Sequence, residues 1–165
     1  MIRELPEGSV VDAGWLGSLG LSASSVRDYV TRGWLQRVAP RLYRRPDPSQ
    51  AELVRWEVAL LSLQALLGQP AHVGGMTALE LAGYWHYAPA GRRRIWVYSD
   101  APPVRTLLAR MPLDADIVLQ SRKLFAVPEL GVESRPLDLV TSTLGPSADT
   151  QPIARKRHQI GRAHV

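Results

Sequence analysis

The stretch SASSVRDYVTRGWLQRVAPRLYRRP, residues 22–46, decides the fold. Three apolar side chains recur in its first half at the spacing of one helix face: Val26, Tyr29 and Val30. The pattern then changes to the alternation of two strands, residues 34–38 and 42–45, with a turn at 39–41. The stretch therefore predicts a helix of about ten residues followed by a basic β-hairpin.

A shorter helix is expected just before this stretch. Residues 9–19 place Val11, Trp15 and Leu19 four positions apart, and Gly20 follows as a stop signal. Ser22 is a good N-cap for the next helix. Helix, turn, helix and hairpin is the order of a winged helix-turn-helix. The same order also serves in purely structural subdomains, in which the arginines are only solvated surface charge.

Length and composition limit the remaining possibilities. The chain has 165 residues, of which 45% are hydrophobic and 21% charged, values typical of a folded protein. It has no cysteine, which excludes disulfides, thiolate zinc sites and thiol catalysis. No apolar run is long enough for a membrane span, and the start lacks the apolar core of a signal peptide. We therefore expect a cytoplasmic protein with no membrane partner.

The positive charge is concentrated at the two ends of the chain. Residues 1–46 contain seven arginines and four acidic residues. The last eleven residues contain four basic residues and no acidic one, whereas the middle is slightly acidic. Because residues 160–165 (IGRAHV) correspond to the translation of a common sequencing-adapter DNA, we expect this tail to be artefactual and the natural C-terminus to be missing. We therefore give these six residues no functional weight.

The rest of the chain predicts a second, smaller region. The expected elements are a helix over 52–67, a helix over 77–84 capped by Thr77, a helix over 104–110, and strands over 94–98, 115–119 and 123–127. The fold class is therefore α+β, with an N-terminal winged helix-turn-helix over 1–46 and a small α+β domain over 52–140. The boundary lies in the proline-marked joint at 47–50, and 141–165 are expected to be a disordered or artefactual tail.

Two motifs resemble one known family. The segments YVTRGWLQRV (29–38) and LYRRP (42–46) resemble the N-terminal winged helix-turn-helix of the AbiEi antitoxins of type IV toxin-antitoxin systems. The segment HVGGMTALELAGYWHY (72–87) is similar to the signature of that family's second domain. The resemblance covers about residues 5–135, and the sequence departs from the family pattern beyond about residue 140.

The resemblance implies a function. Members of this family repress their own toxin-antitoxin operon through the N-terminal module and functionally antagonise a nucleotidyltransferase-like toxin. We therefore expect double-stranded operator DNA as a partner, with a stand-alone winged-helix regulator or a protein-interaction module without a toxin partner as the alternatives. A downstream gene for a nucleotidyltransferase would favour the antitoxin.

The candidate DNA-binding residues lie on the second helix and the hairpin. Short polar groups are expected to read base edges and arginines to bind phosphates. The predicted set is Ser24, Ser25, Arg27, Asp28, Arg32, Arg37, Arg41, Arg44 and Arg45. Asp28 has an alternative, an ion pair with Arg32 one helical turn away, which would remove both from recognition.

Two other features have weaker functional interpretations. The glycine pair Gly74-Gly75 before a helix could cradle a phosphate, but no lysine-serine pair completes such a site, so close helix packing is the favoured reading. The run Arg92–Arg94 is either a second phosphate or RNA patch or a solvated strand entrance.

Catalysis is not expected. His72, Glu80 and His86 lack the spacing of a helical zinc motif. Asp114 and Asp116 alternate, but no glycine-serine loop accompanies them as in a nucleotidyl-transferring site. We therefore expect no enzyme activity, no metal and no cofactor.

Overall fold

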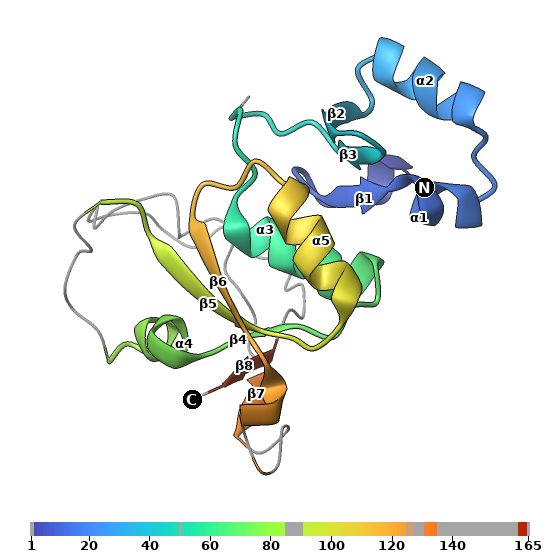
Figure 1. Ribbon diagram of the computed structural model, residues 1–165. Coiled ribbons are helices and arrows are strands. Elements are labelled where there is room, and N and C mark those ends of the chain that lie inside the picture. The colour runs from blue at the N-terminus through green and yellow to red at the C-terminus, as the bar shows by residue number, and fades with distance from the viewer. Residues whose placement is uncertain are drawn as a thin grey trace.

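The computed structural model describes residues 2–49, 51–84, 91–124, 126, 131–134 and 162–164 (Figure 1). The N-terminal elements are the 3₁₀ helix η1 (Ile2–Glu4), β1 (Val10–Asp12), α1 (Ala13–Ser18), α2 (Ala23–Thr31), β2 (Gln36–Ala39) and β3 (Leu42–Arg44). The three strands form an antiparallel sheet in the order β1-β3-β2. This arrangement is a winged helix-turn-helix, with α2 in the position of the recognition helix and β2–β3 as the wing.

The first helix is shorter than predicted, because a strand precedes it. Val11 lies in β1 and pairs with Tyr43, so the four-residue spacing from Val11 to Trp15 crosses an element boundary. The helix begins only at Ala13, after the Asp12 carboxylate accepts a hydrogen bond from the backbone N–H of Trp15 at 2.7 Å. This correction adds a third strand to the predicted two-stranded hairpin.

The turn of the wing consists of residues 40 and 41, one residue fewer than predicted, because Ala39 still belongs to β2 and pairs with Leu42. Arg41 occupies the left-handed region with φ of 59°, unusual for a residue with a side chain. Its carbonyl oxygen accepts a hydrogen bond of 3.0 Å from the backbone N–H of Ala13. The turn of the wing is therefore tied to the start of α1.

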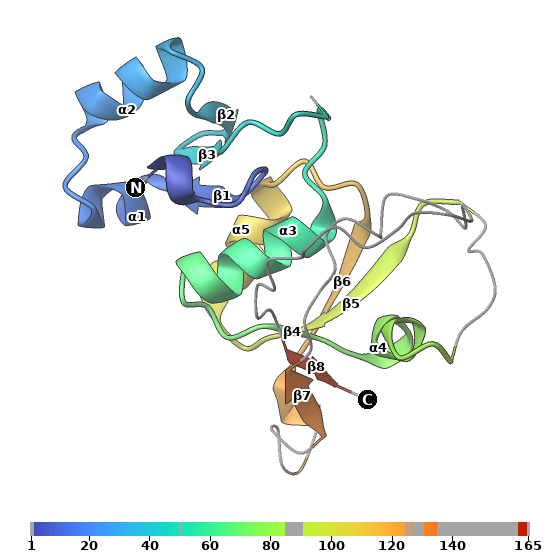
Figure 2. The same cartoon turned by 180° about the vertical axis from the view of Figure 1, so that it is seen from behind.

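The second region contains the remaining elements. They are α3 (Trp56–Leu61), continued by the π-helical turn η2 (Ser62–Leu66), β4 (His72–Val73), α4 (Gly75–Leu81), β5 (Arg94–Tyr98), α5 (Pro102–Arg110), β6 (Asp116–Gln120), the 3₁₀ turn η3 (Arg122–Leu124), β7 (Val132–Ser134) and β8 (Arg162–His164). The five strands form a sheet in the order β6-β5-β4-β8-β7. Helices α3 and α5 lie side by side between this sheet and the winged-helix sheet (Figures 1 and 2).

Several predicted boundaries change. The helix expected over 52–67 begins at Trp56, because Val54 instead forms a bridge with Leu113. Thr77 lies inside α4, where its hydroxyl accepts a hydrogen bond from the backbone N–H of Trp96, and Gly74 occupies the N-cap position. Residues 123 and 124 belong to η3 instead of a strand, and residues 125 and 127 lie outside the described residues.

The C-terminal tail is described only in part. Residues 162–164, which the sequence assigned to an artefactual tail, form β8, whereas 141–161 lie outside the described residues. β8 runs parallel to β4 and antiparallel to β7.

Two apolar clusters hold the molecule together and meet at the winged-helix sheet. Leu42 and Val10 pack with α3, α5 and the larger sheet. Val11 and Tyr43, on the opposite face, pack with the winged-helix helices. The backbone N–H of Val10 also donates a buried 2.9 Å hydrogen bond to the Ser62 hydroxyl. The winged-helix sheet is therefore covered on both faces, and the larger of the two clusters contains residues of both regions.

No helix in the described part of the chain is both long and apolar enough to span a membrane.

Candidate nucleic-acid interface

Helix α2 has one packed face and one exposed face. Val26 is buried and Tyr29 and Val30 are half-buried against the smaller apolar cluster. We define the outward face of α2 by its exposed residues Ser24, Arg27, Asp28, Thr31 and Arg32. In both views α2 lies at the outer edge of the molecule, away from α3 and the larger sheet (Figures 1 and 2). The helix is thus accessible along its polar side.

A cluster of serines begins α2. The Ser22 hydroxyl accepts a hydrogen bond from the backbone N–H of Ser25 at 3.1 Å, which caps the helix. It also lies 2.7 Å from the Ser24 hydroxyl and 2.9 Å from the Ser25 hydroxyl. Ser25 is half-buried in this cluster, whereas Ser24 is exposed. Of the two predicted contact residues, Ser24 therefore has the more accessible hydroxyl.

Arg32 lies beside an aromatic ring. Its guanidinium carbon is 5.6 Å from the centroid of the Trp34 ring. Asp28 forms no ion pair with any described residue. The alternative prediction, an ion pair between Asp28 and Arg32, is therefore wrong. Both residues remain on the outward face.

The wing contributes two exposed arginines, Arg37 on β2 and Arg41 in the turn. Like Arg27 on α2, neither forms a side-chain hydrogen bond or ion pair with any residue that the structure describes. Three guanidinium groups are therefore exposed to solvent without a partner in this part of the chain. A solvated guanidinium presents donors in the fork geometry that suits a phosphate.

The structure corrects the prediction for Arg44. This residue is only 3% exposed. Its Nε donates a 2.7 Å hydrogen bond to Gln36 Oε1, and its Nη atoms donate to the carbonyl oxygens of Ala51 and Leu53. Arg44 cannot reach DNA, because strand alternation places it on the same sheet face as Leu42, the face that packs against the second region.

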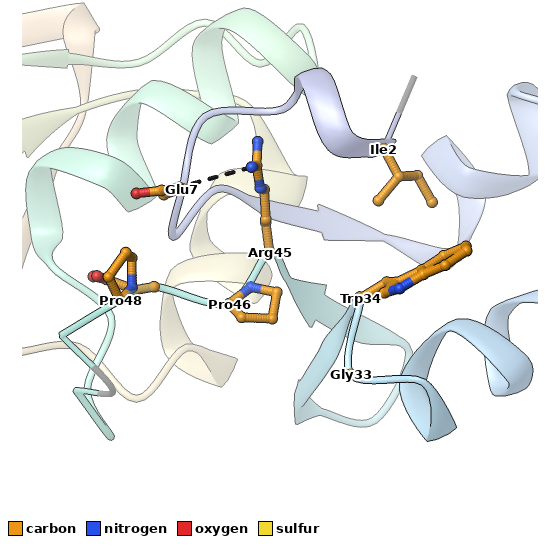
Figure 3. A pocket seen from close by; sticks show the side chains of 8 residues that line it. Ile2, Glu7, Gly33, Trp34, Arg45, Pro46 and Pro48 are labelled. Carbon is orange, nitrogen blue, oxygen red and sulfur yellow. Dashed lines mark ion pairs between the residues drawn. The ribbon is translucent and has the colours of Figure 1, made fainter.

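Arg45 is also engaged inside the protein. Its guanidinium donates to the carbonyl oxygen of Leu5, and it lies 4.0 Å from the carboxylate of Glu7 (Figure 3). Its side chain is 27% exposed. The prediction of a free phosphate-binding cation is therefore corrected here as well: Arg45 fastens the N-terminal segment to the end of the wing.

An open hollow of about 540 Å³ adjoins Arg45 and Glu7. Figure 3 shows Trp34 and Ile2 at one side of it, and Pro46 and Pro48 at the other. The hollow is thus lined by the N-terminal segment, the turn after α2 and the joint after the wing.

Thr31 also lies on the outward face of α2, although it is absent from the predicted set of contact residues. Thr31 is exposed, and helical spacing puts it one turn after Arg27 and Asp28 on the outward face. Its hydroxyl donates to the carbonyl oxygen of Arg27 at 3.1 Å and keeps its acceptor capacity. The helical spacing in the sequence was sufficient to find it.

Gly74, the first glycine of the pair, allows close packing. A Cβ on Gly74 would lie 2.3 Å from Cε2 of Tyr98, so the ring occupies the space of a side chain. Tyr98 in turn stacks on His72, with ring centroids 5.6 Å apart. The close approach between the start of α4 and β5 therefore explains the glycine at position 74, and the prediction of close helix packing is confirmed there.

The run Arg92–Arg94 enters β5 with two of its charges paired. Arg92 lies 3.2 Å from Asp116, and Arg93 lies 2.7 Å from Glu80 and packs over the Trp56 ring. Arg94 is exposed. These pairs favour a strand entrance over a phosphate or RNA patch.

The other titratable candidates have structural contacts. Asp114 accepts a 2.8 Å hydrogen bond from the backbone N–H of Trp56 at the start of α3. His72 is buried, Glu80 pairs with Arg93, and His86 lies outside the described residues. No group of three metal-ligating side chains occurs among the residues that the structure describes.

Comparison with known proteins identifies the N-terminal half. The family model described as a transcriptional regulator, the AbiEi antitoxin N-terminal domain, matches residues 1–90, which include the whole winged helix-turn-helix. A comparison with curated proteins gives no match. Since the matched segment is more than half of the chain, the protein belongs to the family of AbiEi antitoxin N-terminal transcriptional regulators.

Proposed function

We propose that the protein binds double-stranded operator DNA and represses transcription through α2 and the wing. The observation that carries the proposal is the exposed, unpaired state of Arg27, Arg37 and Arg41 within the described chain. Two of them lie on the wing and one on the helix that this fold uses for recognition. Exposed arginines on these two elements form the electrostatic footprint expected of a DNA-binding module.

The proposed contacts divide into two kinds. Ser24, Asp28 and Thr31 lie on the outward face of α2 and would read base edges in the major groove. The exposed arginines of α2 and the wing would bind phosphates and set the orientation of the helix. Arg44 and Arg45 take no part, because their donors are used inside the protein.

The family supports a wider role. We propose that the protein is a cytoplasmic autoregulator and antitoxin of a type IV toxin-antitoxin system, that it functionally antagonises a nucleotidyltransferase-like toxin, and that it has no enzyme activity of its own. The family description names both transcriptional regulation and an antitoxin. Within the described residues, the carboxylates considered for catalysis are occupied in ion pairs or a helix-capping contact.

The DNA-binding proposal is tested by titrating the protein against the DNA upstream of its gene over a series of salt concentrations. The logarithm of the binding constant should fall linearly with the logarithm of salt concentration, and Arg27→Ala and Arg37→Ala should each reduce that slope by about 0.9. The matched control is Arg105→Ala. Arg105 is an exposed arginine on α5, outside the proposed interface, and its substitution should leave the slope unchanged. Equal slopes for all four proteins would contradict the proposal.

The antitoxin proposal needs a separate test. The gene should be co-expressed with a neighbouring gene for a nucleotidyltransferase, and cell growth should recover from the growth arrest that the toxin causes. Operator binding without recovery would instead favour a stand-alone winged-helix regulator. Recovery that survives Arg27→Ala would show that the toxin is opposed through a different surface from the one that binds DNA.

A further inference from the structure

The end of α2 is built to place an aromatic ring beside a cation. Gly33 follows the helix with φ of 71°, a conformation that glycine adopts without strain. The backbone N–H of Trp34 then donates to the carbonyl oxygen of Tyr29 at 2.9 Å, and that of Gly33 donates to Val30 at 3.1 Å. These two bonds form a Schellman motif, which turns the chain back over the last turn of the helix.

This turn brings three side chains together. The ring centroids of Trp34 and Tyr29 lie 5.2 Å apart with an interplanar angle of 38°, the apolar contact that accompanies a Schellman motif. The Arg32 guanidinium carbon lies 5.6 Å from the Trp34 centroid, within cation–π range. Trp34 is nevertheless 36% exposed, which is high for a ring of this size.

From this geometry we infer that Trp34 is a positioning residue for DNA binding, which holds the Arg32 guanidinium ready for a phosphate at the C-terminal end of α2. The inference rests on the proposed function, because it assigns a role within the same surface. Among the described residues no hydrogen bond or ion pair uses the Arg32 guanidinium, so its N–H donors stay available for a phosphate while it lies over the ring. The side chain then loses less rotamer freedom on binding than a fully solvated arginine loses.

This role distinguishes Arg32 from the other exposed arginines. Arg27, Arg37 and Arg41 have no comparable aromatic partner among the described residues. Loss of the Trp34 ring should therefore weaken the contribution of Arg32 to DNA affinity and leave the number of phosphate contacts unchanged. A purely structural role for Trp34 would affect folding stability and would leave the affinity of the folded protein for DNA unaltered.

The test is a double-mutant cycle on binding to the upstream DNA, with Trp34→Leu, Arg32→Gln and the double variant. Trp34→Leu keeps apolar bulk against Tyr29 and removes the aromatic ring, so affinity should fall about threefold with an unchanged salt slope. Arg32→Gln should lower both the affinity and the slope, the latter by about 0.9. The double variant should bind as Arg32→Gln does, because the ring has no cation left to hold.

Trp34→Phe serves as the conservative rescue and should recover part of the affinity, since phenylalanine also stacks with a guanidinium. Thermal unfolding of every variant checks that the folded fractions are equal at the temperature of the binding assay. Independent, multiplicative losses in the cycle, or an unchanged affinity for Trp34→Leu, would overturn the inference and leave the proposed function intact. Absence of salt-dependent binding by the unmodified protein would overturn both.

Discussion

The guanidinium of Arg44, on the wing, donates a hydrogen bond to the carbonyl oxygen of Ala51, in the segment that leads to α3. This contact joins the winged helix-turn-helix to the second region through a side chain that the sequence alone had predicted to contact DNA. The arginines of the wing therefore differ in role: Arg37 and Arg41 face solvent, whereas Arg44 is buried and stabilises the fold.

Arg44→Met should lower the free energy of unfolding by about 2 kcal/mol, because it leaves the carbonyl oxygens of Ala51 and Leu53 without their buried donor. Arg37→Met on the neighbouring strand is the control and should change that free energy by less than about 0.5 kcal/mol, since Arg37 is exposed. Urea unfolding measures both. Similar losses for the two variants would argue against an internal role specific to Arg44.

Arg41→Gly should raise the free energy of unfolding by about 1 kcal/mol, because glycine adopts the left-handed conformation that costs any other residue strain. Arg41→Ala removes the same charge but keeps the unfavourable conformation, so it should give no such gain. The two variants should reduce the salt slope of DNA binding equally. Thermal unfolding measures the effect of backbone strain on stability, and a salt titration of DNA binding measures the effect of the lost charge.

Gly74→Ala should destabilise the protein by about 2 kcal/mol, since the added Cβ would overlap the Tyr98 ring. Gly17→Ala in α1 is the matched control: nothing lies within 4 Å of the new Cβ, and alanine favours a helix by about 0.5 kcal/mol or more. Opposite signs in chemical denaturation are the expected result. A neutral Gly74→Ala variant would mean that Tyr98 can move away at little cost.

Asp28→Asn should reduce discrimination between operator and unrelated DNA. The carboxylate lies on the outward face of α2, where it can accept a hydrogen bond from cytosine and repels phosphates elsewhere. Removing its charge should raise the affinity for unrelated DNA and reduce the ratio of the two affinities by about tenfold. Competition binding with both DNAs measures the ratio; an unchanged ratio would show that Asp28 reads no base.

The sequence by itself determined the local structure of the winged helix-turn-helix. The apolar spacing of Val26, Tyr29 and Val30, the Ser22 cap and the alternation around the turn at 40–41 each reflect interactions between residues close in the chain. The outward face of α2 followed from the same spacing, and only Thr31 of that face was absent from the predicted contact residues. Strand β1 was missed because Val11, Trp15 and Leu19 are spaced four residues apart, as on one face of a helix, although Val11 lies in the strand.

Only the tertiary structure decided which arginines are free. Alternation shows that Tyr43 and Arg44 point to opposite faces of the sheet, but it does not show what covers each face. Here both faces are covered, one by the winged-helix helices and the other by the second region. A charged side chain directed at the second region is therefore buried and must find its partners there. Besides Gln36 on β2, its partners are the carbonyl oxygens of residues 51 and 53, so the role of Arg44 depended on how the segment leading to α3 packs.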